Sequence, residues 1–131
     1  MTYDDILQMK PRELINWLEQ EFIIQLPVNL DTIENLQLAQ EMFSKFGNQY
    51  AYLTMLFNYA KISLREMKRN KDLPKNEIDD MIDKKDAIEK TMSAVYKLKG
   101  DLSRMLTVKQ EINKELGLDG FNNRFVKNKK D

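Results

Sequence analysis

The strongest pattern in the sequence runs from residue 31 to residue 116, where apolar residues recur at intervals of three and four. Its first half contains Leu36, Ala39, Phe43, Phe46, Tyr50, Leu53, Phe57, Ala60, Leu64 and Met67. This spacing is typical of a helix packed along its length against another helix. Pro74 interrupts the pattern, because the residue before a proline disfavours the helical conformation. The pattern therefore predicts two long helices, residues 31–72 and 76–116, paired as an antiparallel, coiled-coil-like hairpin.

The second predicted helix continues the apolar face after the turn. Its members are Ile78, Met81, Ile88, Met92, Val95, Leu98, Leu102, Met105, Ile112 and Leu116. Lys85 and Lys109 stand at seam positions, where polar residues can set the register or the oligomeric state of paired helices. We expect Asn76 to cap this helix and Gly117 to end it.

Two shorter helices are predicted before the hairpin, within residues 1–26. Thr2 suits the N-cap of a helix over residues 3–9, and Pro11 suits the first turn of a helix over residues 11–26. The second of these helices is too apolar on one face to stand alone, so it needs a surface to pack on.

The long helices set the fold class and contain one weak point. Asp31 is expected to cap the first of them, with Glu34 in the position of a capping box. Gly47 lies inside that helix and predicts a local bend or a close helix approach, because glycine weakens helices. We predict an all-α protein with one domain, residues 1–131, in which two N-terminal helices pack on the hairpin and a basic tail follows at residues 117–131.

A belt of apolar residues surrounds the first long helix at residues 50–59. The members of this belt that lie off the seam are Tyr52, Met55, Leu56 and Tyr59. The facing helix of the hairpin cannot cover such a belt, so either the N-terminal helices or another subunit must do so. From the belt and Trp17 we predict an interface for a homo-oligomer or another protein partner.

The composition excludes most enzyme chemistry. The chain has no Cys and no His, so thiol nucleophiles, Ser-His-Asp catalysis and the usual zinc sites are excluded. No glycine-rich phosphate loop is present, and the acids at residues 79–86 are typical of a helix start rather than of a magnesium site. We expect no catalytic activity, metal, cofactor or small-molecule substrate. The acidic N-terminus and the lack of a run of about 18 apolar residues predict a cytoplasmic protein without a membrane segment, in a bacterial host if a phage encodes it.

Charge is balanced over the whole chain but uneven along it. Residues 1–41 hold eight acids and two bases, whereas residues 42–131 hold nineteen bases and thirteen acids. Such asymmetry is typical of nucleic-acid surfaces or electrostatically steered assemblies, unless the two parts neutralise each other within one fold.

One group of bases ends the first long helix. It comprises Lys61, Arg65, Lys68, Arg69 and Lys71. In an antiparallel hairpin that turns near residue 74, this group lies beside the acids of residues 77–86. We expect the two groups to neutralise each other.

Two other groups of bases are candidates for nucleic-acid contact. The first comprises Lys97, Lys99, Arg104 and Lys109, for which we expect no internal charge partner. The second is in the tail, where the rings of Phe121 and Phe125 alternate with the cations of Arg124 and Lys127. Rings that stack on bases and cations that follow the backbone are the chemistry of single-strand binding. The alternatives are a solvated helix face for the first group and docking of the two phenylalanines on the hairpin for the second.

Several positions of the hairpin also match a known family. They are Asp31, Leu36, Ser44-Lys45, Leu64-Arg65, Asp83-Lys84-Lys85-Asp86 and Leu102-Ser103-Arg104-Met105-Leu106-Thr107. Over residues 30–116 the chain resembles the UvsY-like recombination-mediator family of phages. The resemblance implies a small, helical, oligomeric protein that binds single-stranded DNA and helps to load a recombinase. The acidic N-terminal helices and the zero net charge are departures from that family.

Two functions are therefore open. A non-enzymatic accessory protein of phage-type DNA transactions would bind single-stranded DNA and a recombination or replication protein. A protein-interaction or structural module, such as a phage virion component or an inhibitor of a host enzyme, would bind no nucleic acid. A continuous basic track from residues 97–109 to the tail would favour the first, and bases neutralised by acids would favour the second.

Overall fold

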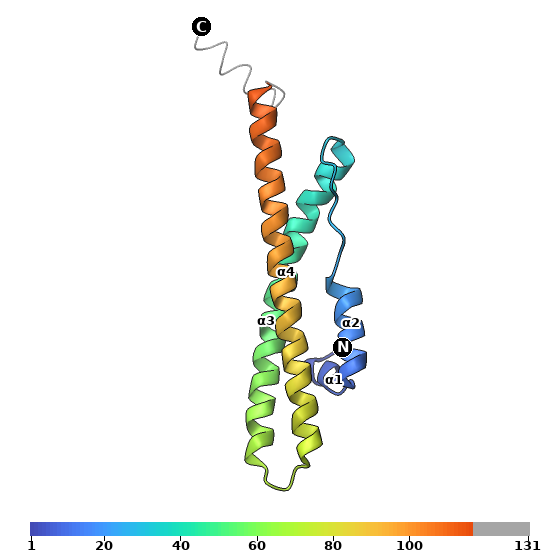
Figure 1. Ribbon diagram of the computed structural model, residues 1–131, viewed down its shortest axis with the longest axis vertical. Coiled ribbons are helices and arrows are strands. Elements are labelled where there is room, and N and C mark those ends of the chain that lie inside the picture. Colours follow the sequence, from blue (N-terminus) through green and yellow to red (C-terminus); the bar gives the residue numbers. More distant parts are fainter. Residues whose placement is uncertain (117–131) are drawn as a thin grey trace.

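The computed structural model describes residues 1–116, which form helices and no strand (Figure 1). The helices are α1 (Tyr3–Leu7), α2 (Pro11–Phe22), α3 (Ile33–Arg69) and α4 (Lys75–Glu115). α3 and α4 lie side by side in an elongated antiparallel hairpin, and α1 and α2 pack on it. The predicted fold class is therefore confirmed. Among the described residues, no helix combines the length and the apolar character needed to cross a bilayer.

The predicted seam forms the core of the hairpin. On α3 the side chains without exposed surface include Ala39, Phe46, Leu53 and Ala60, which follow one another at seven-residue steps. On α4 they are Ile88, Val95 and Leu102, again seven residues apart. A seven-residue repeat keeps one edge of each helix turned toward its partner along this part of the hairpin. The predicted seam does not continue to the end of α4, where Ile112 and Leu116 are 44% and 65% exposed.

The N-terminal helices extend this core. Leu14 and Leu18 of α2 are 0% and 1% exposed, and the helix that carries them packs along α4. α2 ends at Phe22 rather than at the predicted residue 26, because Ile23 adopts an extended conformation with φ −94° and ψ 107°. The chain then runs without a helix from residue 23 to the start of α3.

α1 begins with the predicted cap. The hydroxyl of Thr2 accepts a hydrogen bond from the N–H of Asp5 at 3.1 Å, and the carboxylate of Asp5 accepts one from the N–H of Thr2 at 3.0 Å. The bond from the N–H of Thr2 to the carboxylate stabilises its ionised form, and together with the Thr2 hydroxyl it lowers the pKa of Asp5 from its ordinary value.

The predicted caps of the two long helices were wrong. Thr32 caps α3, since its hydroxyl accepts a hydrogen bond from the N–H of Asn35 at 3.1 Å. Asp31 is thereby left outside the helix. α4 begins directly after Pro74 without a side-chain cap, which places Asn76 inside the helix.

Candidate functional site

The apolar belt of α3 lies largely under the N-terminal helices. Leu56 has no exposed surface, so a partner chain cannot contact it, and its assignment to an oligomer interface was wrong. Tyr52 and Tyr59 both pack against Tyr3 of α1, with 5.6 Å between ring centroids in each pair. The sequence left open whether the N-terminal helices or another subunit covers the belt, and in the structure the N-terminal helices cover most of it.

Two members of the predicted interface have different surroundings. The ring of Trp17 packs edge-on against Phe22, with 5.5 Å between their centroids, and is partly buried. Met55 remains 60% exposed. Met55 is therefore the belt residue that a partner could contact most fully.

Two polar contacts fasten α1 to the hairpin. The hydroxyl of Tyr59 donates a hydrogen bond to a carboxylate oxygen of Asp4, which raises the pKa of Tyr59 above its ordinary value. The ammonium of Lys84 donates to the carbonyl oxygen of Leu7 at 2.6 Å. Burial lowers the pKa of Lys84, and the nearby Asp80 carboxylate acts in the opposite direction. The last carbonyl of α1 thus has the partner that a helix end requires.

The group of bases on α4 is partly neutralised within the chain. The guanidinium of Arg104 pairs with Asp101, one turn earlier on the same helix. The ammonium of Lys109 pairs with Asp31 at 2.7 Å. The prediction that these two bases have no internal partner was wrong, because Asp31 reaches Lys109 from the connection before α3 rather than from the facing helix.

The other two bases of this group do not form a continuous track with them. Lys97 is exposed, whereas Lys99 is half-buried, with its ammonium 5.4 Å from the centroid of the Phe43 ring. A cation over an aromatic face is already stabilised by that ring. Lys97 is therefore the member of the group that is most available to a phosphate.

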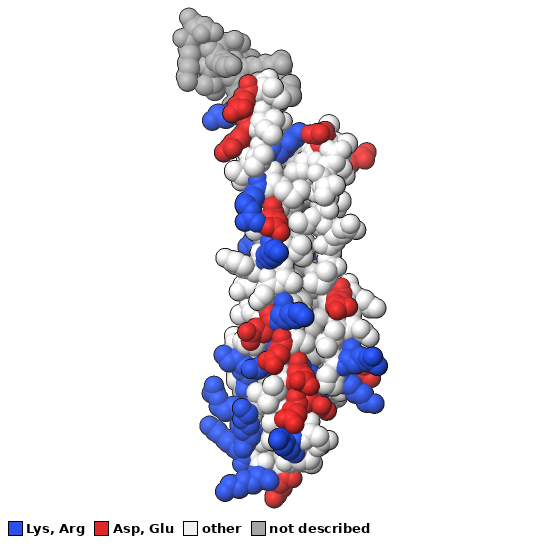
Figure 2. Space-filling view, viewed as in Figure 1, with Lys and Arg blue, Asp and Glu red and all other residues white. Residues whose placement is uncertain are grey.

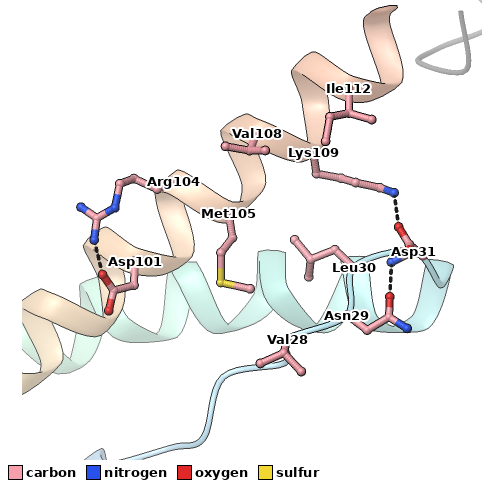
Figure 3. Close-up of a pocket in the computed structure, with 10 residues that line it drawn as sticks. All are labelled: Val28, Asn29, Leu30, Asp31, Asp101, Arg104, Met105, Val108, Lys109 and Ile112. Carbon is pink, nitrogen blue, oxygen red and sulfur yellow. Dashed lines mark hydrogen bonds and ion pairs between the residues drawn. The ribbon is translucent and has the colours of Figure 1, made fainter. Parts of the chain in front are cut away.

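An apolar groove lies beside these ion pairs, at the open end of the hairpin (Figure 3). It has a volume of about 500 Å³ and lies between α4 and the connection before α3. Its apolar lining comes from Val28, Leu30, Met105, Val108 and Ile112. The charges along it form the Arg104–Asp101 and Lys109–Asp31 pairs, so the groove has little net charge.

The group at the end of α3 has a different environment from the one predicted. Four of its bases form what we call the basic stripe, which comprises Lys61, Arg65, Lys68 and Arg69. All four are exposed, and the ammonium of Lys61 lies 5.3 Å from the centroid of the Phe57 ring. Within residues 1–116, none of them lies within 4.0 Å of a carboxylate, because the ion pairs of this part of the chain are elsewhere. The predicted neutralisation by the acids of α4 was wrong.

The helical period explains why the basic stripe remains free. Ala60 and Leu64 face the core, and each residue turns the helix by about 100°. Lys61 and Arg65 therefore project to the side of the hairpin rather than toward α4. Figure 2 shows the result: bases gather over the end of α3, and acids form a separate row over α4. The bases recur at intervals of three and four residues, like the core residues, but on a different side of the helix. This difference is visible in the sequence and could have identified the site.

The remaining candidates are those of the tail and those for metal binding. Phe121, Arg124, Phe125 and Lys127 lie outside the described residues. Within residues 1–116, no group of three or more acidic side chains is arranged to hold a metal ion.

Comparisons with known proteins identify no relative, since no family model, curated protein or solved structure matches the chain.

Proposed function

We propose that the protein is a non-enzymatic accessory factor that binds single-stranded DNA through the basic stripe of α3. One observation carries the proposal: four bases share one exposed side of a helix and have no carboxylate partner among the described residues. Exposed cations without a carboxylate partner, in a row on one helix, are suited to neutralise consecutive phosphates and release their counterions.

The biological role in this proposal comes from the resemblance of the hairpin to phage recombination mediators. A protein of that kind would act beside a recombination or replication protein in DNA transactions. The partner and the cytoplasmic location are parts of the proposal that the resemblance and the sequence support.

A salt-dependent titration of single-stranded DNA tests the proposal. The logarithm of the affinity falls with the logarithm of the salt concentration, and each phosphate contact to a single strand contributes about 0.7 to the steepness of this salt slope. The triple variant Lys61→Ala/Arg65→Ala/Lys68→Ala should therefore lower the steepness by about 2. The control Lys10→Ala/Arg12→Ala/Lys45→Ala removes the same types and number of charges from other exposed positions and should leave the slope unchanged. Equal effects of the two triple variants, or no binding by the wild type at low salt, would exclude the proposed site.

A second candidate function is a protein-interaction module without nucleic-acid binding. It is favoured by the neutralised bases of α4 and by the apolar groove at the open end of the hairpin. Under this alternative, the wild type does not bind single-stranded DNA at any salt concentration, so the same titration distinguishes the two candidate functions.

A further inference from the structure

Two exposed surfaces of the chain have apolar centres and opposite charge. One is the side of α3 turned away from α4, where Met55 and Ile62 are 60% and 52% exposed. The other is a groove between α2 and α4, where Ile15 and Ile23 are 42% and 46% exposed. Isolated apolar residues are common on protein surfaces, whereas exposed apolar patches with a polar rim mark interaction sites.

The groove between α2 and α4 is acidic at its rim. It has a volume of about 430 Å³, and its floor and walls include Ile15, Ile23, Ala87 and Ala94. The charged residues along it are Glu19, Asp83 and Asp86, opposed by Lys90. A partner for this groove should therefore present apolar side chains next to bases.

The outer side of α3 has this chemistry. Met55 and Ile62 are seven residues apart, which places them about two turns apart on the same side of the helix. Lys61 and Arg65 of the basic stripe border Ile62, and Glu66, which is exposed one turn after Ile62, is the acid that these bases outnumber on residues 61–69. Leu64 faces the core, and a step of two residues turns the helix by about 200°, so Ile62 points away from the hairpin.

We propose that the groove between α2 and α4 receives the outer side of α3 from a second copy of the chain. Met55 and Ile62 would pack against Ile15 and Ile23, and the bases beside them would face the acidic rim. One chain cannot make this contact with itself, because α2 packs along α4 whereas this side of α3 points away from α4. The contact joins two different surfaces, so it is heterologous and adds further copies as a ring if the rotation closes and as an open filament if it does not.

The first test compares two similarly exposed apolar residues by sedimentation. Ile62→Asp places a charge in the proposed contact, whereas Leu38→Asp places one at a residue of α3 that is 46% exposed and lines neither groove. Association of the full chain should weaken by at least about tenfold in the first variant, a central interface effect of about 1.4 kcal/mol. The second variant should assemble like the wild type. Circular dichroism confirms that both variants are folded.

The second test exchanges the charges. Lys61→Glu/Arg65→Glu and Asp83→Lys/Asp86→Lys should each weaken assembly, and the four changes combined in one chain should restore it. Lys61 and Arg65 cannot face the acidic rim and phosphates at the same time, so assembly and DNA binding through these two bases exclude each other. No DNA is present in this test, so failure of this proposal is distinct from failure of the proposed DNA site. A wild type that stays at 15.6 kDa at every concentration, equal losses in Ile62→Asp and Leu38→Asp, or no restoration by the combined exchange would each overturn the inference.

Discussion

Replacing Gly47 by alanine should stabilise the protein. α3 runs through Gly47 without interruption from Ile33 to Arg69, so a residue with a higher helix propensity fits the backbone there. A methyl group added at this position would lie 3.7 Å from the ammonium nitrogen of Lys99, which is an ordinary van der Waals contact with the end of a flexible side chain. Space therefore does not oppose the change.

The size of the effect follows from the helix alone. Glycine inside a helix is about 0.8–1.0 kcal/mol less favourable than alanine, mainly because the unfolded glycine has more conformational freedom to lose. We therefore expect Gly47→Ala to raise the free energy of unfolding by about 1 kcal/mol. For a domain of this size, that corresponds to an increase of about 4 °C in Tm.

Urea unfolding followed by circular dichroism measures this change. The midpoint should rise while the slope of the free energy against urea stays constant, because the surface exposed on unfolding is unchanged. Gly100→Ala provides a second case, since its added methyl group would meet only the guanidinium of Arg104, at 3.8 Å. A decrease in stability for Gly47→Ala would refute the reasoning and would show that α3 needs a bend or a closer approach at this residue.

Two further predictions concern the N-terminal helices. Leu14→Ala should lower the free energy of unfolding by about 3 kcal/mol because Leu14 is fully buried. Ile15→Ala, at the exposed neighbouring residue of the same helix, should lower it by less than about 1 kcal/mol. Equal losses of the two variants in urea unfolding at low protein concentration would contradict the packing of α2. The Tyr59–Asp4 hydrogen bond raises the pKa of Tyr59 above 10.0, so it contributes stability below pH 10.0 that is lost as the pH rises through the raised value. The difference in stability between the wild type and Tyr59→Phe should therefore be constant below that pH and disappear above it, and a difference that persists in strong alkali would rule out this contribution.

The parts of the fold that depend on local periodicity could be predicted from the sequence. Phe46, Leu53 and Ala60 are buried because the seam repeats along one helix, and this repeat is visible without knowledge of the partner helix. The capping residue of α3 could not be predicted in this way, since Asp31 and Thr32 are both good caps. In the structure Thr32 is the cap, and Asp31 instead forms an ion pair with Lys109, which is 78 residues away along the chain.

The sequence also could not predict which bases of the hairpin meet an acid, because such pairs too depend on residues that are far apart in the chain. Adjacent positions along two helices do not decide whether a base on one meets an acid on the other, because the rotation of each helix about its axis matters as much as its register. Lys61 and Arg65 are rotated away from α4 and remain free. The same ambiguity led to the opposite error at Lys109, whose partner comes from outside the two long helices.

The fastening of α1 by Lys84 has a consequence for synthesis on the ribosome. Leu7 and Lys84 are 77 residues apart in the chain, and translation adds about 5–20 residues each second, so α1 waits roughly 4–15 s for its partner to be made. α2 has 12 residues, and a helix of this length is only marginally stable alone in water, so most of its stability comes from packing. During this interval the leucine face of α2 has no α4 to pack against. The apolar face of the α2 segment thus stays uncovered on the nascent chain until most of α4 has emerged, and chaperones that bind exposed apolar segments can hold it during this time.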